Sequence, residues 1–184
     1  MNIEELLTEK KKTIIQKWID QVLDSYSSPG FFKKQKDRFA NPIGATVSDG
    51  LQEIYTILLE GRELAEAARH LEYIIKIRAV QDFNPSQAVA FVYQLKNIVR
   101  DEVAKVKDQD QLLDGLAKLD TRIDQVALMA FDFYMNCRER LHQIRVNEIL
   151  SGRSALTDGN QCVSAMLKRS QTESTDNSKI NRLT

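Results

Sequence analysis

The sequence predicts an all-α protein, and three observations support that prediction. Gly (7) and Pro (3) are scarce among the 184 residues, whereas turn-rich β-sandwiches and barrels need such residues at short intervals. Apolar residues recur three or four positions apart along most of the chain, as they do on the buried face of an amphipathic helix. Each proline stands at a boundary between two such stretches. We therefore expect a bundle of about five helices, the last of them unusually long.

Charge and composition exclude several classes of protein. Lys+Arg (26) balance Asp+Glu (26), and 42% of the residues are hydrophobic. A disordered chain would be less apolar or more highly charged, and a nucleic-acid-binding domain would carry a basic excess. The length suits one domain with its own core. We expect neither a nucleic-acid partner nor a disordered chain.

The compartment is predicted to be the cytoplasm. Residues 1–5 are polar and acidic, unlike the basic and then apolar start of a signal peptide. No apolar run is long enough to span a bilayer, so we expect no direct membrane insertion. The two cysteines, Cys137 and Cys162, are interpreted as free thiols because cytosolic proteins rarely keep disulfides.

The first helix is predicted from Asn2 to about Tyr26. Asn2 can cap it, with Glu5 in the reciprocal position of a capping box. The three lysines at 10–12 interrupt the apolar stripe, and we expect the helix to emerge into solvent there. Residues 27–30 (SSPG) end it, since Pro and Gly both oppose continuation.

A short basic and aromatic stretch, residues 31–39, comes next. It could contact nucleic acid, or it could be an amphipathic connector with Phe32 and Phe39 buried and its lysines in solvent. The zero net charge of the chain favours the connector. The pair Asn41-Pro42 then predicts the start of a second long helix, and Gly61 is a plausible C-terminal cap for it.

Two further helices are predicted in the middle of the chain. The third covers about residues 62–80 and turns Leu71, Ile74 and Ile75 inward. The fourth begins at residues 84–87 (NPSQ), where Asn caps, Pro takes the first helical position and Gln completes a capping box. It is expected to continue to about Val106.

The last helix is predicted from about Gln111 to Leu150. At 1.5 Å per residue it would be on the order of 60 Å long, about twice the diameter of a compact domain of this size. We therefore expect its last turns to protrude, break or pair with a second copy. The charges at Arg138, Glu139, Arg140 and Arg145 are typical of the flank of a coiled-coil seam, which favours a homodimer through this helix. Residues 151–184 are polar and are predicted to be a disordered tail, leaving residues 1–150 as the helical domain.

The sequence contains no recognisable catalytic or metal-binding set, so we expect neither an enzyme nor a cofactor. Glu139 and His142 match half of a di-iron site, but such a site needs a second Glu-x-x-His and two more glutamates. Asp120 and Asp124 would share a helix face, where acidic pairs are usually solvated. His70 could ligate haem only from within a pocket, and a surface histidine is the simpler interpretation.

Polar residues gather at the junction of the third and fourth helices. Arg78 and Asp82 stand four residues apart and could pair on the helix surface. Ser86 and Gln87 lie in the first turn of the fourth helix, whose free N–H groups could bind an anion or a carbonyl. Two interpretations stay open here. The junction is either a buried structural corner held by hydrogen bonds or a site for a ligand or partner.

Two blocks of sequence resemble a known family. Residues 35–44 (QKDRFANPIG) and 77–88 (IRAVQDFNPSQA) are similar to the N-terminal domains of RsbR-type RsbT co-antagonists, and the similarity covers about Glu4 to Ile149. This resemblance implies a dimeric sensory or regulatory domain, related in fold to globins but without haem. In RsbR-like proteins an output module that controls a partner kinase follows the domain, whereas here we expect only the polar tail of residues 151–184.

The leading hypothesis is therefore a non-enzymatic, homodimeric signalling or interaction domain with a globin-like fold. It would contact a protein partner or small ligand, both unidentified, at the helix junction or at the basic segment. Two alternatives are a haem- or metal-binding globin-like sensor and an accessory protein that docks onto a larger redox or membrane-associated complex. The candidate binding residues are Arg78, Gln81, Asp82, Ser86, Gln87, Lys36 and Arg38.

Overall fold

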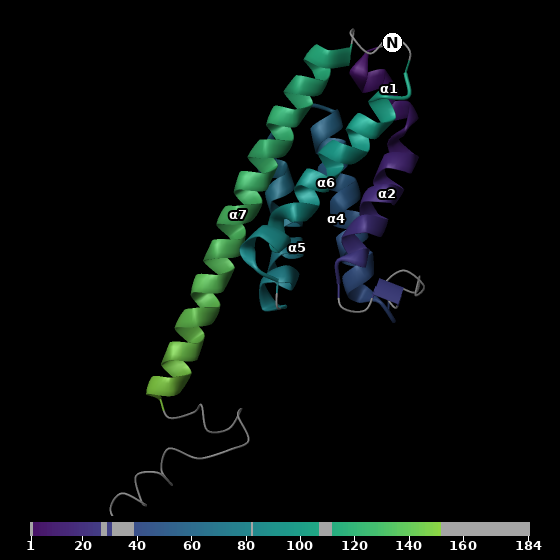
Figure 1. Ribbon diagram of the computed structural model, residues 1–184. Coiled ribbons are helices and arrows are strands. Elements are labelled where there is room, and N and C mark those ends of the chain that lie inside the picture. The colour runs from purple at the N-terminus through teal and green to yellow at the C-terminus, as the bar shows by residue number, and fades with distance from the viewer. Residues whose placement is uncertain (1, 27–28, 31–38, 82, 107–111, 152–184) are drawn as a thin grey trace, which may run out of the picture. The chain divides into compact units, whose positions relative to one another are not determined.

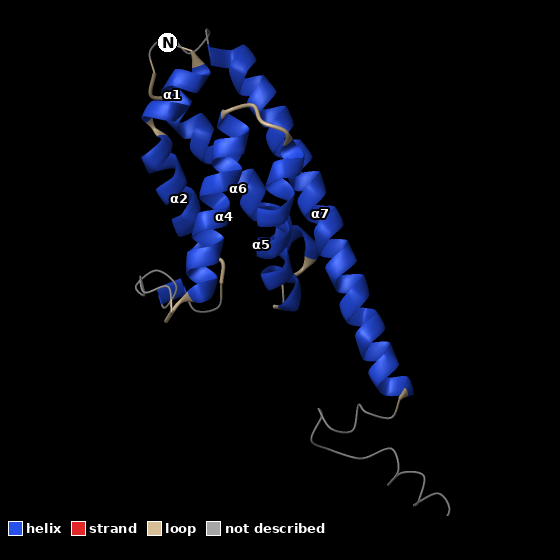
Figure 2. Ribbon diagram, turned by 180° about the vertical axis from the view of Figure 1, so that it is seen from behind, coloured by secondary structure: helices blue, strands red, loops and turns tan. Residues whose placement is uncertain are grey.

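The structure is a computed structural model that describes residues 2–26, 29–30, 39–81, 83–106 and 112–151. Within these ranges there are helices and no strands (Figure 2), which confirms the all-α prediction. The α-helices and one short 3-10 helix (η1) are α1 (Ile3–Glu9), α2 (Lys11–Asp24), α4 (Pro42–Leu59), η1 (Leu64–Ala67), α5 (Ala68–Val80), α6 (Pro85–Val103) and α7 (Leu113–Leu150) (Figure 1). The globin-like relationship stays a prediction.

The chain divides into two units, Met1–Arg138 and Glu139–Thr184. The first unit contains the hydrophobic core. In the second, the described residues are 139–151, and all of them are exposed. The predicted domain boundary after residue 150 stays a prediction, and the predicted tail from residue 152 lies outside the described residues. No helix within the described ranges is long and apolar enough to cross a membrane.

The core of the first unit lies between α2, α4, α5 and α6. Helix α4 packs against α5 and α2, and α2 packs against α6. Trp18 of α2 is fully buried, and its indole Nε1 donates to the Phe91 carbonyl of α6 at 2.7 Å. The first part of α7 contributes the buried residues Leu119, Ile123, Val126, Ala127, Ala130 and Tyr134 to the same core.

The predicted helix starts are confirmed where a side chain closes the first turn. The Asn2 side chain accepts from the Glu5 N–H at 2.7 Å, and the Glu5 carboxylate accepts from the Asn2 N–H at 3.0 Å. Asn41 caps α4 by accepting from the Gly44 N–H at 2.9 Å. At the other end of α4, Gly61 has φ 67°, the left-handed conformation that a glycine after a helix commonly adopts.

The predicted first helix is wrong in one respect, because the chain bends at Lys10 and forms two helices. In an uninterrupted helix the Leu7 carbonyl accepts from the N–H of residue 11. Here it accepts from the Tyr55 hydroxyl of α4 at 3.0 Å. A contact with a distant helix therefore accompanies the bend, and the local sequence does not contain that information.

Other boundaries and one burial prediction also differ from expectation. Helix α5 begins at Ala68 after a 3-10 turn, and α6 ends at Val103. Phe39 was expected to be buried but is 97% exposed, because it lies in the turn immediately before the Asn41 cap. Phe32 lies outside the described residues.

Glu102 is a buried carboxylate held by two lysines from different parts of the chain. Its side chain is 4% exposed, and its Oε1 accepts from Lys17 Nζ at 2.6 Å and Lys105 Nζ at 2.7 Å. The hydrogen bonds from Lys105 and Lys17 lower the pKa of this carboxyl, against the opposing effect of burial. The pair Lys17–Glu102 joins α2 to the end of α6.

Truncation of a core leucine should destabilise the protein far more than truncation of a surface leucine. Leu51 is 0% exposed, whereas Leu113 is 53% exposed. We expect Leu51→Ala to lower the free energy of unfolding by about 2–5 kcal/mol, since a buried cavity remains. Leu113→Ala should change it by less than about 0.5 kcal/mol. Urea denaturation of both variants measures this, and equal effects would contradict the assigned core.

Stability should fall on acidification through Glu102. Its folded pKa lies below the ordinary value of 4.5, so the unfolded chain binds more protons as the pH falls. The stabilisation is therefore present above that value and is lost as the pH falls through the folded pKa. We expect Glu102→Gln to reduce stability at pH 7 by roughly 1–2 kcal/mol and to make little difference in strong acid. Thermal melts across pH measure this, with Glu63→Gln at an exposed position as the control.

Candidate functional site

The strongest candidate site is built around Arg78, in the last turn of α5. Its side chain is 1% exposed, and its guanidinium carbon lies 5.1 Å from the ring centroid of Tyr26, 4.3 Å from that of Phe83 and 5.3 Å from that of Phe91. Such distances are those of cation–π contacts. We call these four residues the Arg78 cluster. It brings together the end of α2, the α5–α6 turn and α6.

Hydrogen bonds add to the ring contacts. Arg78 Nη2 donates to the Ser25 hydroxyl at 3.0 Å and to the Gln87 carbonyl at 3.3 Å. Burial lowers the pKa of Arg78, and the neighbouring Tyr26 hydroxyl acts in the opposite direction. Burial in turn raises the pKa of Tyr26, against the opposing effect of Arg78. The cluster is thus a buried cation surrounded mainly by aromatic rings.

The structure corrects the expectation that Arg78 lies on the helix surface, whereas its pairing with Asp82 stays a prediction. Arg78 points into the core, because three aromatic rings and two oxygen acceptors replace the water it would otherwise meet. Helix α5 ends at Val80, before Asp82 is reached. Asp82 lies outside the described residues, as do Lys36 and Arg38 of the second candidate segment.

Ser86 and Gln87 take part in capping α6. The Asn84 side chain accepts from the Gln87 N–H at 2.9 Å and from the Ser86 hydroxyl at 2.8 Å. The Gln87 side chain accepts from the Asn84 N–H at 3.1 Å. Gln81 is half-buried, and its carbonyl accepts from the Phe83 N–H at 2.8 Å. The capping box predicted here is confirmed, and it occupies side chains that had been candidates for binding.

Two side chains of α7 hold the turn beside the Arg78 cluster. The Tyr134 hydroxyl donates to the Phe83 carbonyl at 2.6 Å. Arg138 Nη1 donates to the Ala79 carbonyl at 3.3 Å. Phe83 belongs to the Arg78 cluster, and Ala79 directly follows Arg78 in the sequence. Arg138 is the last residue of the first unit. The cluster is therefore tied to α7 where that helix reaches the end of the core.

Sequence reasoning found Arg78 at the helix junction but did not place Tyr26 and Phe91 beside it. Tyr26 was expected only as the end of the first helix. Their separation along the chain leaves no local pattern that joins them. A tyrosine on an apolar helix face is a usable signal, because its hydroxyl generally needs a partner when buried.

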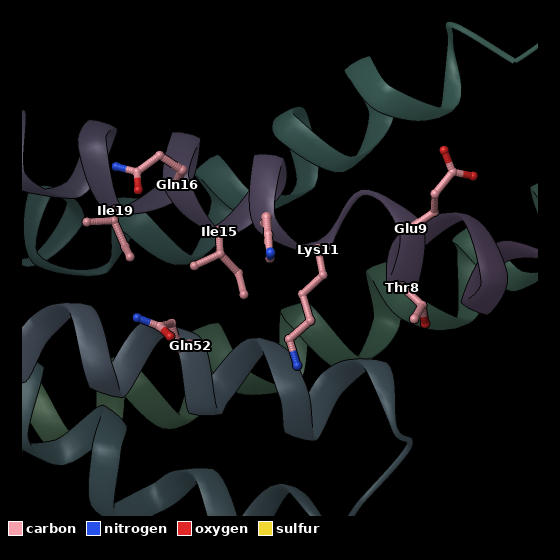
Figure 3. A pocket seen from close by; sticks show the side chains of 8 residues that line it. Thr8, Glu9, Lys11, Ile15, Gln16, Ile19 and Gln52 are labelled. Atoms are coloured by element: carbon pink, nitrogen blue, oxygen red, sulfur yellow. The ribbon is translucent and has the colours of Figure 1, made fainter.

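A second feature is a surface groove between α1, α2 and α4, with a volume of about 710 Å³ (Figure 3). Its polar character comes from lysine, glutamate and amide side chains, and Lys11 Nζ donates to the Thr56 hydroxyl at 3.0 Å. Two isoleucines form its apolar part. The residues that line it are Thr8, Glu9, Lys11, Lys12, Ile15, Gln16, Ile19 and Gln52.

The two histidines belong to different helices. His70 is half-buried in α5, and His142 is exposed in α7. Across the described part of the chain, no group of three His, Cys, Asp or Glu side chains is arranged to hold a metal ion. Cys137 is half-buried in α7, and Cys162 lies outside the described residues.

The fold and the site define a class of protein. It is an all-α domain in which the buried arginine and aromatic residues of a helix junction are hydrogen-bonded to one long C-terminal helix. Comparison with known proteins then gives the family. The family model described as "RsbT co-antagonist protein rsbRD N-terminal domain" matches residues 12–149, so this chain belongs to the RsbRD N-terminal domain family.

A relative among the curated proteins is similar to this chain over nearly the same number of residues. It is an uncharacterized protein of Archaeoglobus fulgidus, 23% identical over 139 residues that cover 75% of this chain and 83% of the relative. No solved structure matches the chain.

Loss of the Tyr134 hydroxyl should weaken the link between α7 and the α5–α6 turn. Tyr134 is 2% exposed, so Tyr134→Phe leaves the Phe83 carbonyl without this donor in a buried setting. We expect a loss of about 1 kcal/mol in the free energy of unfolding. Chemical denaturation measures it, with Tyr73→Phe, at a residue 52% exposed, as the control. Equal stability of wild type and Tyr134→Phe would contradict the assigned bond.

Proposed function

We propose that this protein is a non-enzymatic regulatory domain of stress signalling that acts in the cytoplasm without haem. Membership of the RsbRD N-terminal domain family supports a regulatory role. In this proposal a ligand or partner contacts the α5–α6 junction, and α7 carries the response. The junction residues are Arg78, Gln81, Asp82, Ser86 and Gln87, with Lys36 and Arg38 as a second contact.

One observation supports α7 as the output element. The apolar stripe that is buried from Leu119 to Tyr134 continues at helical spacing with Leu141 and Ile144. These two side chains are 37% and 50% exposed. When apolar residues on an exposed part of a helix continue the spacing of a buried stripe, packing against another helix is favoured over contact with water.

The partner helix in this proposal is α7 of a second copy. A symmetric pair would place the same stripe on both sides of the interface, as a two-fold axis requires. Arginine and glutamate side chains at 138–140 and 145 would flank the seam and set its register. The proposed homodimer therefore uses an exposed part of α7 that the core leaves uncovered.

A paired substitution tests the homodimer. Leu141→Glu with Ile144→Glu places two charges on the stripe, and we expect it to convert a dimer into a folded monomer, because burial of an unpaired carboxylate is costly. Light scattering coupled to size exclusion measures the mass, and circular dichroism confirms the fold.

The matched control is Gln143→Glu with Asn147→Glu, which adds the same charge at exposed positions away from the stripe. It should leave the mass of a dimer unchanged. A wild-type protein that is monomeric at micromolar concentration would overturn the proposed dimer. A Leu141→Glu, Ile144→Glu variant that keeps the mass of the dimer would overturn it as well.

A further inference from the structure

The donors of Arg78 are incompletely satisfied. A guanidinium carries five N–H groups, and Nη2 accounts for two of them through Ser25 and Gln87. Nε and Nη1 are buried and have no hydrogen-bond partner among the described residues. A buried donor without an acceptor is destabilising, so these two nitrogens require an acceptor from elsewhere.

The charge of Arg78 is also uncompensated within the described part of the chain. Within the described ranges, Tyr26 is the group that acts on it electrostatically, and no carboxylate contributes. Cation–π contacts supply part of the missing solvation. The rings of Phe83 and Phe91 interact with the guanidinium as π-systems, and Tyr26 acts on it through both its ring and its hydroxyl. A further oxygen acceptor must approach in the guanidinium plane, at Nε or Nη1.

We propose that Arg78 anchors a binding site for the carboxylate of a small organic acid, and that occupancy of this site is relayed to α7. The inference rests on the proposed regulatory function and names the ligand class of its junction site. A carboxylate brings one negative charge to one buried cation and accepts hydrogen bonds from its free donors. A phosphate brings more charge than the cluster can balance, and the excess would be buried at a cost.

The site is closed in the described structure, and Phe83 is the element that would have to move. Phe83 is half-buried, and its ring lies closest to the guanidinium. It is separated from Arg78 by the short turn after α5. In this proposal the ligand enters where this ring is displaced, beside Asn84, which is exposed.

The relay follows from what else Phe83 touches. Its carbonyl accepts from Tyr134, and the nearby Ala79 carbonyl accepts from Arg138. In this proposal the backbone of Phe83 moves with its ring, which strains or breaks the Tyr134 bond that holds α7 beside the cluster. We expect carboxylate binding to loosen α7 around and beyond Tyr134.

The first test observes Arg78 directly in the full-length protein. Nitrogen-15 NMR of arginine Nε–H groups would be followed while sodium acetate or sodium benzoate replaces sodium chloride at constant ionic strength. We expect a saturable shift of the Arg78 Nε–H signal, assigned by its loss in Arg78→Lys. The Nε–H of Arg122 is also buried and unpartnered among the described residues, and it serves as the internal control that should not move.

Three outcomes of this titration would overturn the proposal. One is the absence of a saturable shift with either acid, and another is an equal response to inorganic phosphate. The third concerns Asp82. If Asp82→Asn shifts the Arg78 signal in acid-free buffer as strongly as ligand does in wild type, the chain supplies its own carboxylate and no ligand is required.

Thermal melting provides a second measurement. At about ten times the Kd, benzoate or acetate should raise the Tm by about 3–5 °C, and Arg78→Met should abolish the rise. Arg100→Met, at an exposed arginine paired with Asp120, should retain it. If Arg78→Met does not fold, the NMR titration of the wild type still decides. A rise that persists in folded Arg78→Met would overturn the site.

Hydrogen exchange tests the relay. Saturating acid should increase amide exchange at residues 134–150 several-fold in wild type, and this response should be lost in Tyr134→Phe although acid still binds. Binding without any change in exchange would overturn the relay. The failure of the carboxylate site would leave the mass of the dimer unaffected, so it is distinguishable from a failure of the proposed homodimer.

Discussion

The buried guanidinium of Arg78 is the constraint on which the arrangement of several helices depends. A charge removed from water must be surrounded by groups that replace its solvation. Tyr26 comes from the end of α2, Phe83 from the turn before α6, and Phe91 and the Gln87 carbonyl from α6 itself. Residues that are far apart in the sequence therefore all contact the Arg78 guanidinium. Trp18 extends the cluster by stacking on Phe91, with 6.4 Å between the ring centroids.

Helix α7 meets two environments with one pattern of apolar residues. Up to Tyr134 the stripe is buried in the core, and at Leu141 and Ile144 the same spacing lies on an exposed helix. The pattern therefore specifies a helix throughout but does not specify what covers it. Arg122 shows how polar groups on this helix also serve the core, since it donates to the Arg62 carbonyl just after Gly61 at the end of α4.

Which features the sequence could predict depends on how far apart along the chain the interacting residues stand. The caps at Asn2, Asn41 and Asn84 involve residues three positions apart, so they are readable from local sequence. The bend at Lys10 accompanies a bond from Tyr55 to the Leu7 carbonyl, and no local pattern contains it. Arg78 was singled out correctly as unusual, but a charged side chain is ordinarily expected at the surface. Its burial depends on rings that only the tertiary structure brings together.

The extent of the family match bears on how α7 should be regarded. The match runs to residue 149, beyond Arg138, where the unit that holds the core ends. A simple linker would have no reason to share the pattern of the domain that precedes it, whereas a helix that is part of the domain would. Leu141 and Ile144 fall within the matched residues and hold the apolar spacing of the buried stripe. The family match therefore includes the exposed turns of α7 as far as residue 149, together with the buried part of the same helix.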